Sequence, residues 1–457
     1  MTIATYLHDV LSSFSDRRIT RNITTLVQRI IEGTSLRLWS VSSDKKEFER
    51  HKHLLDGSLK SELDAETLST VLRIQAAQQA ADQEVVVLLH DPCDIRKPYA
   101  SDLENLGKVR SLDGKLIPGY SSFETVLVDE RGRNPQPFDM TIYSNGDPAY
   151  VTEEELHFVQ QGTLDQKATA ERTAVIRQAI KEDTYVNLNR VVRAQLRRIS
   201  LQVKATMPDK AVWHILDRQF DGEPYFSFID QELNDLCLIR LKANRNSQEW
   251  TVDAETGTAR WLKLIECAFA HQYRESLSTL RIKKTTYQNV TRVLEWDTLA
   301  LSGTTYTVVR VTLLNRTGHP IYPQPMVLLT NVAVFGVDDA RELYRLYLLR
   351  AKIENVFKFC KQVLGWETVQ VRDYRSICNL LALGFFVAGY FYLIDSALIC
   401  DPVLIFICAL GGGKGRVTRH FFVLGVQKLL VFRTVEHMKR MWELTGREWE
   451  DVVNCIL

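Results

Sequence analysis

The sequence predicts a mixed α/β protein, and three observations support this fold class. Two short runs of β-branched and apolar residues, 84–90 and 211–216, have the length and composition of buried strands. The regions before, between and after them carry apolar residues at helical spacing. Residues 246–324 instead contain several alternating or β-branched stretches. We therefore expect an N-terminal helical domain, a central sheet, a β-rich insertion and C-terminal helices.

The composition bounds the class of protein. A chain of 457 residues is long enough for two or three domains with a large core. A formal net charge of +1 means that any binding of a polyanion must use local patches of positive charge. The eight cysteines include no Cys-x-x-Cys pair, which indicates reduced thiols in a cytosolic protein rather than disulfides or a zinc site. The N-terminus lacks the basic start and long apolar run of a signal peptide.

The first eighty residues predict short helices. Residues 17–32 carry isoleucines and a leucine at helical spacing, with arginines on other faces. Residues 42–53 are polar and strongly charged, and Asp64 is a candidate cap for a helix over 65–81. Small basic helical domains are common DNA readers, and a solvated helical cap is the alternative interpretation.

Both predicted strands are followed by carboxylates. The run 84–90 leads into Asp91-Pro92, and we expect the strand to stop at Asp91 because proline cannot continue a central ladder. The run 211–216 leads into Asp217-Arg218. A carboxylate just past a buried strand is well placed to hold a hard cation at a sheet edge. The alternative is that each aspartate only caps a turn.

Between and beyond these points the chain alternates in type. Residues 123–128 and 138–144 predict a strand pair joined by a turn at 131–135. Residues 153–204 are mostly helical in pattern, and 246–324 predict the β-rich insertion. Within that insertion Trp250, Trp261 and Trp296 have the character of core residues, with stacking on a displaced base as the alternative.

Residues 347–361 contain no glycine or proline and predict one helix. On such a helix Tyr347, Arg350, Glu354 and Lys361 share an arc about 60° wide. One carboxylate would thus lie among cations and a phenol, which suits a metal-binding glutamate beside a phosphate-rich ligand. The alternative is a solvated face with a Glu-Lys pair.

The C-terminal region contains an apolar run, 377–394, that is long enough to span a membrane. A buried helix is the favoured interpretation, because no other segment supports membrane topology. Gly411–Gly415 lacks the spacing and the final Ser or Thr of a P-loop. Residues 416–455 predict two amphipathic helices.

The spacing Tyr-x2-Arg-x3-Glu-x6-Lys from Tyr347 to Lys361 resembles the signature of DDE transposases of bacterial insertion sequences, in insertion-sequence family four. The resemblance covers roughly residues 80–400. It implies a ribonuclease-H-like catalytic core in which Asp91, Asp217 and Glu354 are the catalytic residues and metal ligands. Asp94 is the competitor of Asp91, and Asp221 is the weaker candidate beside Asp217.

The resemblance also implies chemistry and partners. The activity would be Mg²⁺-dependent DNA strand cleavage and strand transfer by a cut-and-paste transposase of a mobile element, with two Mg²⁺ ions for which Mn²⁺ can substitute. Tyr347, Arg350, Lys361 and Arg218 would contact DNA. The partners would be the terminal inverted repeats and target DNA, bound by a homodimer in the cytoplasm of a bacterium or archaeon, at the nucleoid, with no membrane.

The domain boundaries expected from these patterns are as follows: 1–80, a helical DNA-binding domain; 81–245, the first part of the catalytic core; 246–325, the β-rich insertion; 326–400, the second part of the core with the glutamate helix; and 401–457, a C-terminal helical region. The main alternative function is a catalytically inactive DNA-binding relative that acts as a repressor or a domesticated protein.

Overall fold

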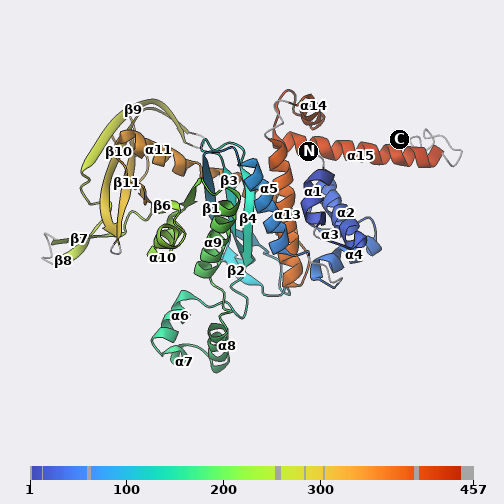
Figure 1. The fold of residues 1–457 in the computed structure, drawn as a ribbon, viewed down its shortest axis with the longest axis horizontal. Coiled ribbons are helices and arrows are strands. Elements are labelled where there is room, and N and C mark those ends of the chain that lie inside the picture. The colour runs from blue at the N-terminus through green and yellow to red at the C-terminus, as the bar shows by residue number, and fades with distance from the viewer. Residues whose placement is uncertain are drawn as a thin grey trace. The chain divides into compact units, whose positions relative to one another are not determined.

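The computed structural model describes residues 3–12, 14–58, 63–252, 259–282, 285–301, 304–395 and 401–443 (Figure 1). The chain forms two compact units. Unit 1 consists of Met1–Leu72, Ile95–Gly119 and Val356–Leu457, and unit 2 of Arg73–Asp94 and Tyr120–Asn355. The class is mixed α/β, with helices toward both ends of the chain and a mixed sheet in its centre, as the sequence predicts.

A mixed sheet organises unit 2. Among the described residues its strands lie in the order β4-β3-β1-β5-β6-β12-β11-β10-β9, and β2 pairs with the first residues of β3. β1, β5 and β6 run parallel to one another. β3 and β4 are antiparallel, and so is each neighbouring pair in the series β6-β12-β11-β10-β9. The strands are β1 (Val85–Arg96), β2 (Gly107–Arg110), β3 (Leu116–Val128), β4 (Gln136–Tyr143), β5 (Ala211–Leu216), β6 (Leu236–Leu241), β9 (His271–Ile282), β10 (Thr285–Leu301), β11 (Thr304–Leu314) and β12 (Met326–Thr330).

Strand β1 runs further than its sequence predicts, through Asp91 and Pro92 to Arg96. The prediction that it stops at Asp91 is therefore wrong. Its pairing with β5 ends at Leu89, before Pro92. The N–H group that Pro92 lacks is therefore not needed for the hydrogen bonds between these two strands. The strand continues because it also neighbours β3, whose Ser122 hydroxyl donates to the Cys93 carbonyl at 3.1 Å.

Apolar side chains of the strands bury against helices. Alternate residues of β1, such as Val86 and Leu88, pack with Ile199 and Val203 of α9 (Leu188–Thr206). A second cluster joins β6, β11 and β12 to Phe226 of α10 (Glu223–Ser227). The strands predicted in the insertion are present, including a separate pair, β7 (Asn246–Val252) and β8 (Ala259–Lys263). Trp296 is buried, whereas the side chains of Trp250 and Trp261 lie outside the described residues.

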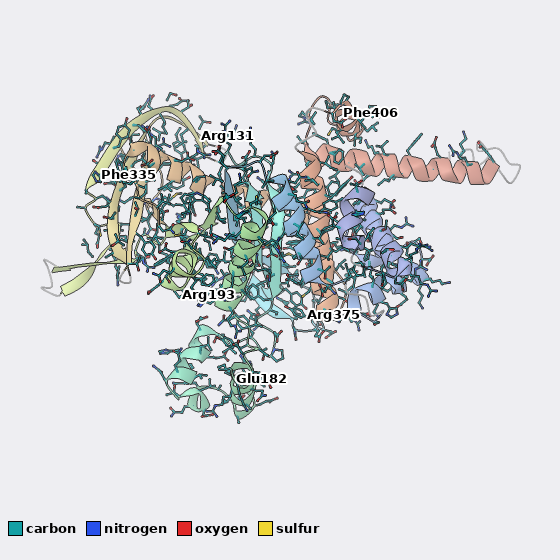
Figure 2. The ribbon with its side chains drawn as sticks, in the orientation of Figure 1. Arg131, Glu182, Arg193, Phe335, Arg375 and Phe406 are labelled. Carbon is teal, nitrogen blue, oxygen red and sulfur yellow. The ribbon has the colours of Figure 1, made fainter. Side chains whose placement is uncertain are left out.

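The connection between β4 and α9 forms a small helical lobe. It contains α6 (Glu153–Gln160), α7 (Leu164–Lys167) and α8 (Ala170–Lys181), around a core of its own centred on Val151, Leu164 and Ile176. Glu182, which follows α8, marks this lobe in Figure 2. Where the chain returns toward α9, the backbone of Val151 and Val186 is hydrogen-bonded at 2.9 Å.

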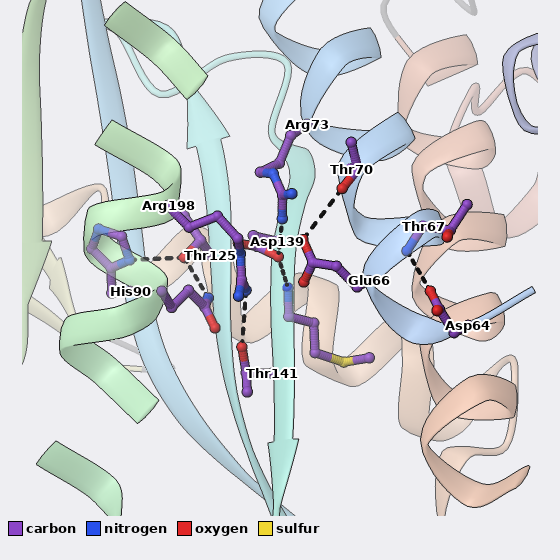
Figure 3. Close-up of polar contacts among 12 residues, drawn as sticks. Asp64, Glu66, Thr67, Thr70, Arg73, His90, Thr125, Asp139, Thr141 and Arg198 are labelled. Carbon is purple, nitrogen blue, oxygen red and sulfur yellow. Dashed lines mark hydrogen bonds and ion pairs between the residues drawn. The ribbon is translucent and has the colours of Figure 1, made fainter. Parts of the chain in front are cut away.

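A buried ion cluster crosses the sheet at Asp139 of β4, which is fully buried. Arg73 Nη1 lies 3.0 Å from its Oδ1, and Arg198 of α9 lies 2.9 Å from its Oδ2 (Figure 3). Removing one partner of such a buried group costs about 3–5 kcal/mol. Asp139 therefore ties α5 (Ala65–Gln79) and α9 to the same strand of the sheet.

Unit 1 is mainly helical. The predicted N-terminal helices are α2 (Arg17–Gly33), α4 (Lys45–Asp56) and α5, and the Asp64 carboxylate accepts from the Thr67 N–H at 2.7 Å, as predicted for a cap. Unit 1 also contains α1 (Ile3–Ser12), α3 (Leu38–Val41), α13 (Tyr374–Asp395), α14 (Pro402–Leu410) and α15 (Arg419–Glu443). One helix, α15, is described within 416–443, and the rest of the range predicted to hold two helices, 444–455, lies outside the described residues.

Helix α13 contains the apolar run. Among the described residues, Tyr374–Ile394 is the one helix long and apolar enough to cross a membrane, and 94% of this stretch is buried within the protein. That degree of burial is typical of a core helix.

Candidate active site

The parallel register of β1 and β5 sets two aspartates at equivalent positions. Leu89 pairs with Ile215, and Asp91 and Asp217 each lie two residues further along. Parallel strands end at the same edge of a sheet, so both carboxylates are delivered to one place. Asp217 also begins a short 3₁₀ turn, Arg218–Phe220, that carries the chain away from the sheet.

The region predicted as one helix is two. Helix α11 (Val337–Leu348) ends just before Leu349 and Arg350, and α12 (Ala351–Gln362) follows. The two N–H groups there donate three residues back, Leu349 to Leu346 and Arg350 to Tyr347, as in a tightened turn. No glycine or proline marks the break. We attribute it to tertiary contacts, because the side chain of Arg350 is held by carboxylates from other elements.

Arg350 is the centre of the cluster. Its Nη1 lies 2.7 Å from Asp91 Oδ2, and its Nη2 lies 3.7 Å from Asp217 Oδ2 and 3.6 Å from Glu354 Oε1. The Arg350 side chain is 16% exposed, whereas that of Glu354 is 63% exposed. The structure thus brings together three acidic residues that lie more than a hundred positions apart in the sequence, and we call them with Arg350 the acidic site.

Tyr347 adds a hydrogen bond to this site. Its hydroxyl, at the end of α11, donates to Asp217 Oδ1 at 3.1 Å. Burial raises the pKa of Tyr347 well above its ordinary value, and the charge of Asp217 raises it further. The phenol therefore stays protonated and serves as a donor that orients Asp217.

The electrostatics of Asp91 show how crowded with negative charge the site is. Burial raises the pKa of Asp91 to about 6, the cationic Arg350 opposes this rise, and the charges of Asp217 and Glu354 add to it. Burial alone would lower the pKa of Arg350, but Asp91 and Asp217 outweigh it and raise that pKa. One guanidinium thus partly compensates three carboxylates.

The donor set has the chemistry that Mg²⁺ or Mn²⁺ takes, namely hard carboxylate oxygens. As they stand, no three carboxylate, imidazole or thiol groups in the described part of the chain lie close enough together to hold a metal ion. The acidic site explains this physically, because the Arg350 guanidinium lies among the carboxylates and spaces them. The residues fit a divalent cation, and the exposed Glu354 side chain has room to turn toward one.

A cavity of about 720 Å³ adjoins this site in unit 2. Ala351 and Leu348 of the α11–α12 region line it, together with Tyr344. Three arginines also line it, and within the described residues none of the three has a carboxylate partner: Arg218, Arg240 and Arg281. A cavity with apolar walls and unpaired guanidinium groups suits a ligand that carries phosphate.

The other predicted residues lie as follows. Lys361 is on α12 in unit 1, where its Nζ is 3.7 Å from Glu367 Oε1. Asp221 accepts from the backbone and side chain of Lys242, at 3.2 Å each, and so supports the start of the next loop. Of the two aspartates on β1, Asp91 is the one that contacts Arg350, whereas the charge of Asp94 acts on Tyr143.

Sequence reasoning missed a buried polar chain beneath the acidic site. His90 Nε2 lies 3.0 Å from His214 Nδ1, and His214 Nε2 lies 3.1 Å from Asp235 Oδ2. The other His90 nitrogen contacts the Thr125 hydroxyl at 2.9 Å (Figure 3). These contacts link β1 to β3 and β5, and they link β5 to Asp235, which lies just before β6. The sequence signal was a histidine within each of two otherwise apolar strand runs.

Two further residues were missed. Arg240 lines the cavity from β6, where a cation in an otherwise apolar strand was the available signal. Gly132, in the β3–β4 turn, has φ +70°, and a Cβ there would collide with the Leu349 side chain of the α11–α12 turn. Its lack of a side chain lets the two turns pack together.

Comparison with known proteins agrees with this geometry. Residues 168–388 match a family described as "Transposase DDE domain". The matched range contains Asp217, Arg350 and Glu354 and begins after Asp91. A comparison with curated proteins finds no match. The chain therefore carries a transposase DDE domain, which implies a transposase-like function with DNA as a partner, and DDE transposases generally use divalent metal ions.

Proposed function

We propose that this protein is a cut-and-paste DNA transposase of insertion-sequence family four, which nicks, excises and joins the ends of its element by metal-dependent phosphoryl transfer. The carrying observation is the convergence of Asp91, Asp217 and Glu354 on Arg350. The match to a transposase DDE domain supports it. Tyr347, Arg350, Glu354 and Lys361 at family spacing favour this subgroup.

Asp91, Asp217 and Glu354 would hold two Mg²⁺ or Mn²⁺ ions. Such ions supply Lewis acidity that activates an attacking water or 3′-hydroxyl and stabilises the leaving oxygen. The protein's own groups fix the ligands before any cation binds. Tyr347 holds one oxygen of Asp217, and the parallel register holds Asp91 level with it.

Arg350 has two parts in this proposal. It compensates the carboxylates in the structure, and its planar guanidinium would also suit a bidentate contact with a DNA phosphate if a cation took its place among them. Arg218, Arg240 and Arg281 in the adjoining cavity extend the cationic path for the strand. Lys361 would contribute a further phosphate contact. Hairpin formation at the element end is part of the family resemblance.

We propose that the active form is a homodimer on paired ends, located with the nucleoid in the cytoplasm of a bacterium or archaeon. Exposed apolar side chains support a further protein contact, among them Phe406 of α14 (Figure 2) and Phe432 of α15, which are 59% and 62% exposed.

The test is nicking of an end-labelled duplex that carries the inverted repeat flanking the gene. We expect Mg²⁺- or Mn²⁺-dependent nicking by the parent and a loss of at least about 10³-fold in Glu354→Gln, because a neutral amide is a poor ligand for a hard cation. The matched control is Glu342→Gln, which removes an exposed carboxylate of α11 that pairs only locally with Arg345.

Three results decide between the functions. Nicking by Glu342→Gln at the parent rate together with loss in Glu354→Gln supports the proposal. Binding of the repeat without nicking by the parent, with either metal, would support the inactive repressor instead. Nicking that survives Glu354→Gln would refute the assignment of the acidic site.

A further inference from the structure

A second cationic surface lies in unit 1, among residues that the proposed chemistry does not use. It surrounds a cavity of about 770 Å³. Four separate segments line it: the start of α3, the chain after β1, the β2–β3 turn, and the stretch before α13. We call it the basic cleft and define it by Arg37, Arg96, Lys97, Tyr99, Leu112 and Arg372.

The charge of the basic cleft is unbalanced. Four of the lining residues are cationic, and Glu367 is the one acidic residue among them. Glu367 is already engaged, since its Oε1 lies 2.8 Å from Arg96 Nε and 3.7 Å from Lys361 Nζ. In the described part of the chain, the guanidinium groups of Arg37 and Arg372 have no carboxylate partner.

Lys97 adds a buried positive charge. Its side chain is directed at the backbone, with Nζ donating to the carbonyls of Trp366 at 3.1 Å and Val369 at 3.0 Å. Neutral carbonyls satisfy the hydrogen bonds of the ammonium group but carry no charge to balance it, and Glu367, whose charge acts on Lys97, is shared with Arg96 and Lys361. An anion in the cleft would offset that charge together with those of Arg37 and Arg372.

Two apolar side chains beside these cations are open to solvent. Tyr99 is fully exposed and Leu112 is 93% exposed. Tyr99 is presented by a tight turn in which Pro98 precedes it and the Ala100 N–H donates to the Lys97 carbonyl at 3.0 Å. The Tyr99 ring points into solvent from this turn and buries no apolar surface within the protein. Its exposed position therefore does not contribute to the stability of the fold.

We propose that the basic cleft binds the phosphate backbone of duplex DNA, through residues other than those of the acidic site. The cations come from three separate segments and are spread over an open surface, which matches a polyanion with regularly spaced charges better than a single small anion. The side chains of the cleft provide positive charges and one aromatic ring. Contacts between positive charges and phosphate groups carry no information about base sequence. The binding is therefore independent of base sequence, as a contact with target or flanking DNA requires. The identity of the polyanion rests on the proposed function.

The test is fluorescence anisotropy of the full chain with a labelled 30-base-pair duplex of arbitrary sequence, across a series of salt concentrations. The variant Arg37→Gln/Arg372→Gln removes the two guanidinium groups of the cleft that have no carboxylate partner among the described residues. We expect its Kd to rise about tenfold and the slope of log K against log salt to fall by about 2, because each lost phosphate contact contributes about 0.9. Tyr99→Ala should weaken binding and leave the slope unchanged, since it removes no charge.

The matched control is Lys167→Gln/Lys181→Gln, which removes the same charge from exposed lysines of the helical lobe in unit 2. The altered side chains of Arg37 and Arg372 are exposed, so thermal melting of each variant should match the parent and confirm folding. Parent-like affinity and slope in Arg37→Gln/Arg372→Gln, or an equal loss in the control, would overturn the inference. So would a preference for single strands over the duplex in the parent.

The nicking assay, with Glu354→Gln as its inactive reference, separates this inference from the proposed function. The parent protein could bind the duplex through the basic cleft and yet fail to nick the element end. That result would support the inference and refute the proposed catalysis. Alternatively, the parent could nick the element end normally while the Arg37→Gln/Arg372→Gln variant binds the duplex like the parent. That result would refute only the inference.

Discussion

Arg350 Nη1 lies 2.7 Å from Asp91 Oδ2, so an arginine of the predicted DNA-contacting set is bound to a predicted metal ligand. In the proposed function, a guanidinium and a divalent cation would compete for the same carboxylate. Metal binding would then require an internal cation to move aside, which leads to the first prediction.

Replacing Arg350 with methionine should make folding depend on metal. Without the guanidinium, Asp91, Asp217 and Glu354 repel one another, so the melting temperature in EDTA should fall. Added Mg²⁺ or Mn²⁺ then no longer competes with Arg350, and the rise in melting temperature on adding metal should exceed that of the parent. Differential scanning fluorimetry with and without metal measures both effects. A variant that responds to metal no more than the parent would contradict the competition.

Tyr347→Phe removes one hydrogen bond and little else. The loss of the Tyr347–Asp217 contact should cost about 1 kcal/mol in the free energy of unfolding. Nicking of the element end should slow, because Asp217 loses the donor that orients it. Chemical denaturation and a single-turnover assay check the two expectations. Tyr322→Phe, an exposed tyrosine of the adjoining cavity, serves as the control.

Gly132→Ala should disturb the acidic site from a distance. The new methyl group meets Leu349, and the residue must keep a φ of +70° that disfavours alanine. We expect a loss of about 1–3 kcal/mol in stability together with slower nicking. Gly114→Ala also has positive φ but meets no neighbouring atom within 4 Å, so it should cost stability without affecting nicking.

Asp235 predicts acid sensitivity of the buried polar chain. Burial alone would raise the pKa of Asp235, but hydrogen bonds and charge from His214, with further bonds from Lys204 and Ser200, lower it below its usual 3.8. A carboxylate whose folded pKa is lowered contributes stability above the unfolded value and loses it as pH falls through the folded value. Urea unfolding from pH 6 to pH 3 should show this loss in the parent.

Asp235→Asn should flatten part of that pH dependence and lower stability at pH 6, because Lys204 and His214 lose their anionic partner. Asp165→Asn, which removes an exposed partner of Arg177, should leave the pH profile unchanged. Equal profiles for the parent and Asp235→Asn would contradict the prediction.

The exposed apolar side chains of α14 and α15 predict self-association. Phe406→Ser/Phe432→Ser removes two large exposed rings, so we expect a lower molar mass by light scattering at concentrations where the parent is dimeric. Thermal melting should change little, because neither ring is buried within the chain. A parent that remains monomeric with its paired DNA ends would contradict the homodimer.

Local pattern predicted much of the fold, and tertiary contact decided the rest. The bounds of β5 follow from its apolar run, the position of α2 follows from helical spacing, and the start of α5 follows from its aspartate cap. The break at Leu349 and Arg350 had no local signal, because contacts with Asp91 and Asp217 hold Arg350 there. The prediction for the length of β1 was wrong because β1 also lies beside β3, and the local sequence around Pro92 does not indicate that second neighbour.

The candidate site divides in the same way. Asp91, Asp217 and Glu354 were predicted from strand ends and family spacing, and the structure brings them to one guanidinium. Arg240 and Arg281 come from β6 and β9, and only the folded sheet shows that they share a cavity with Arg218. Gly132 required knowledge of the turn that it packs against.

The pairing of β6 with β12 has a consequence for the newly made chain. β6 emerges from the ribosome long before residues 326–330 are translated, and until then one of its edges has open backbone groups. An open edge next to a finished parallel sheet invites pairing with a neighbouring chain. Products that stop before β12 should therefore aggregate, so premature termination yields insoluble protein rather than a free N-terminal fragment.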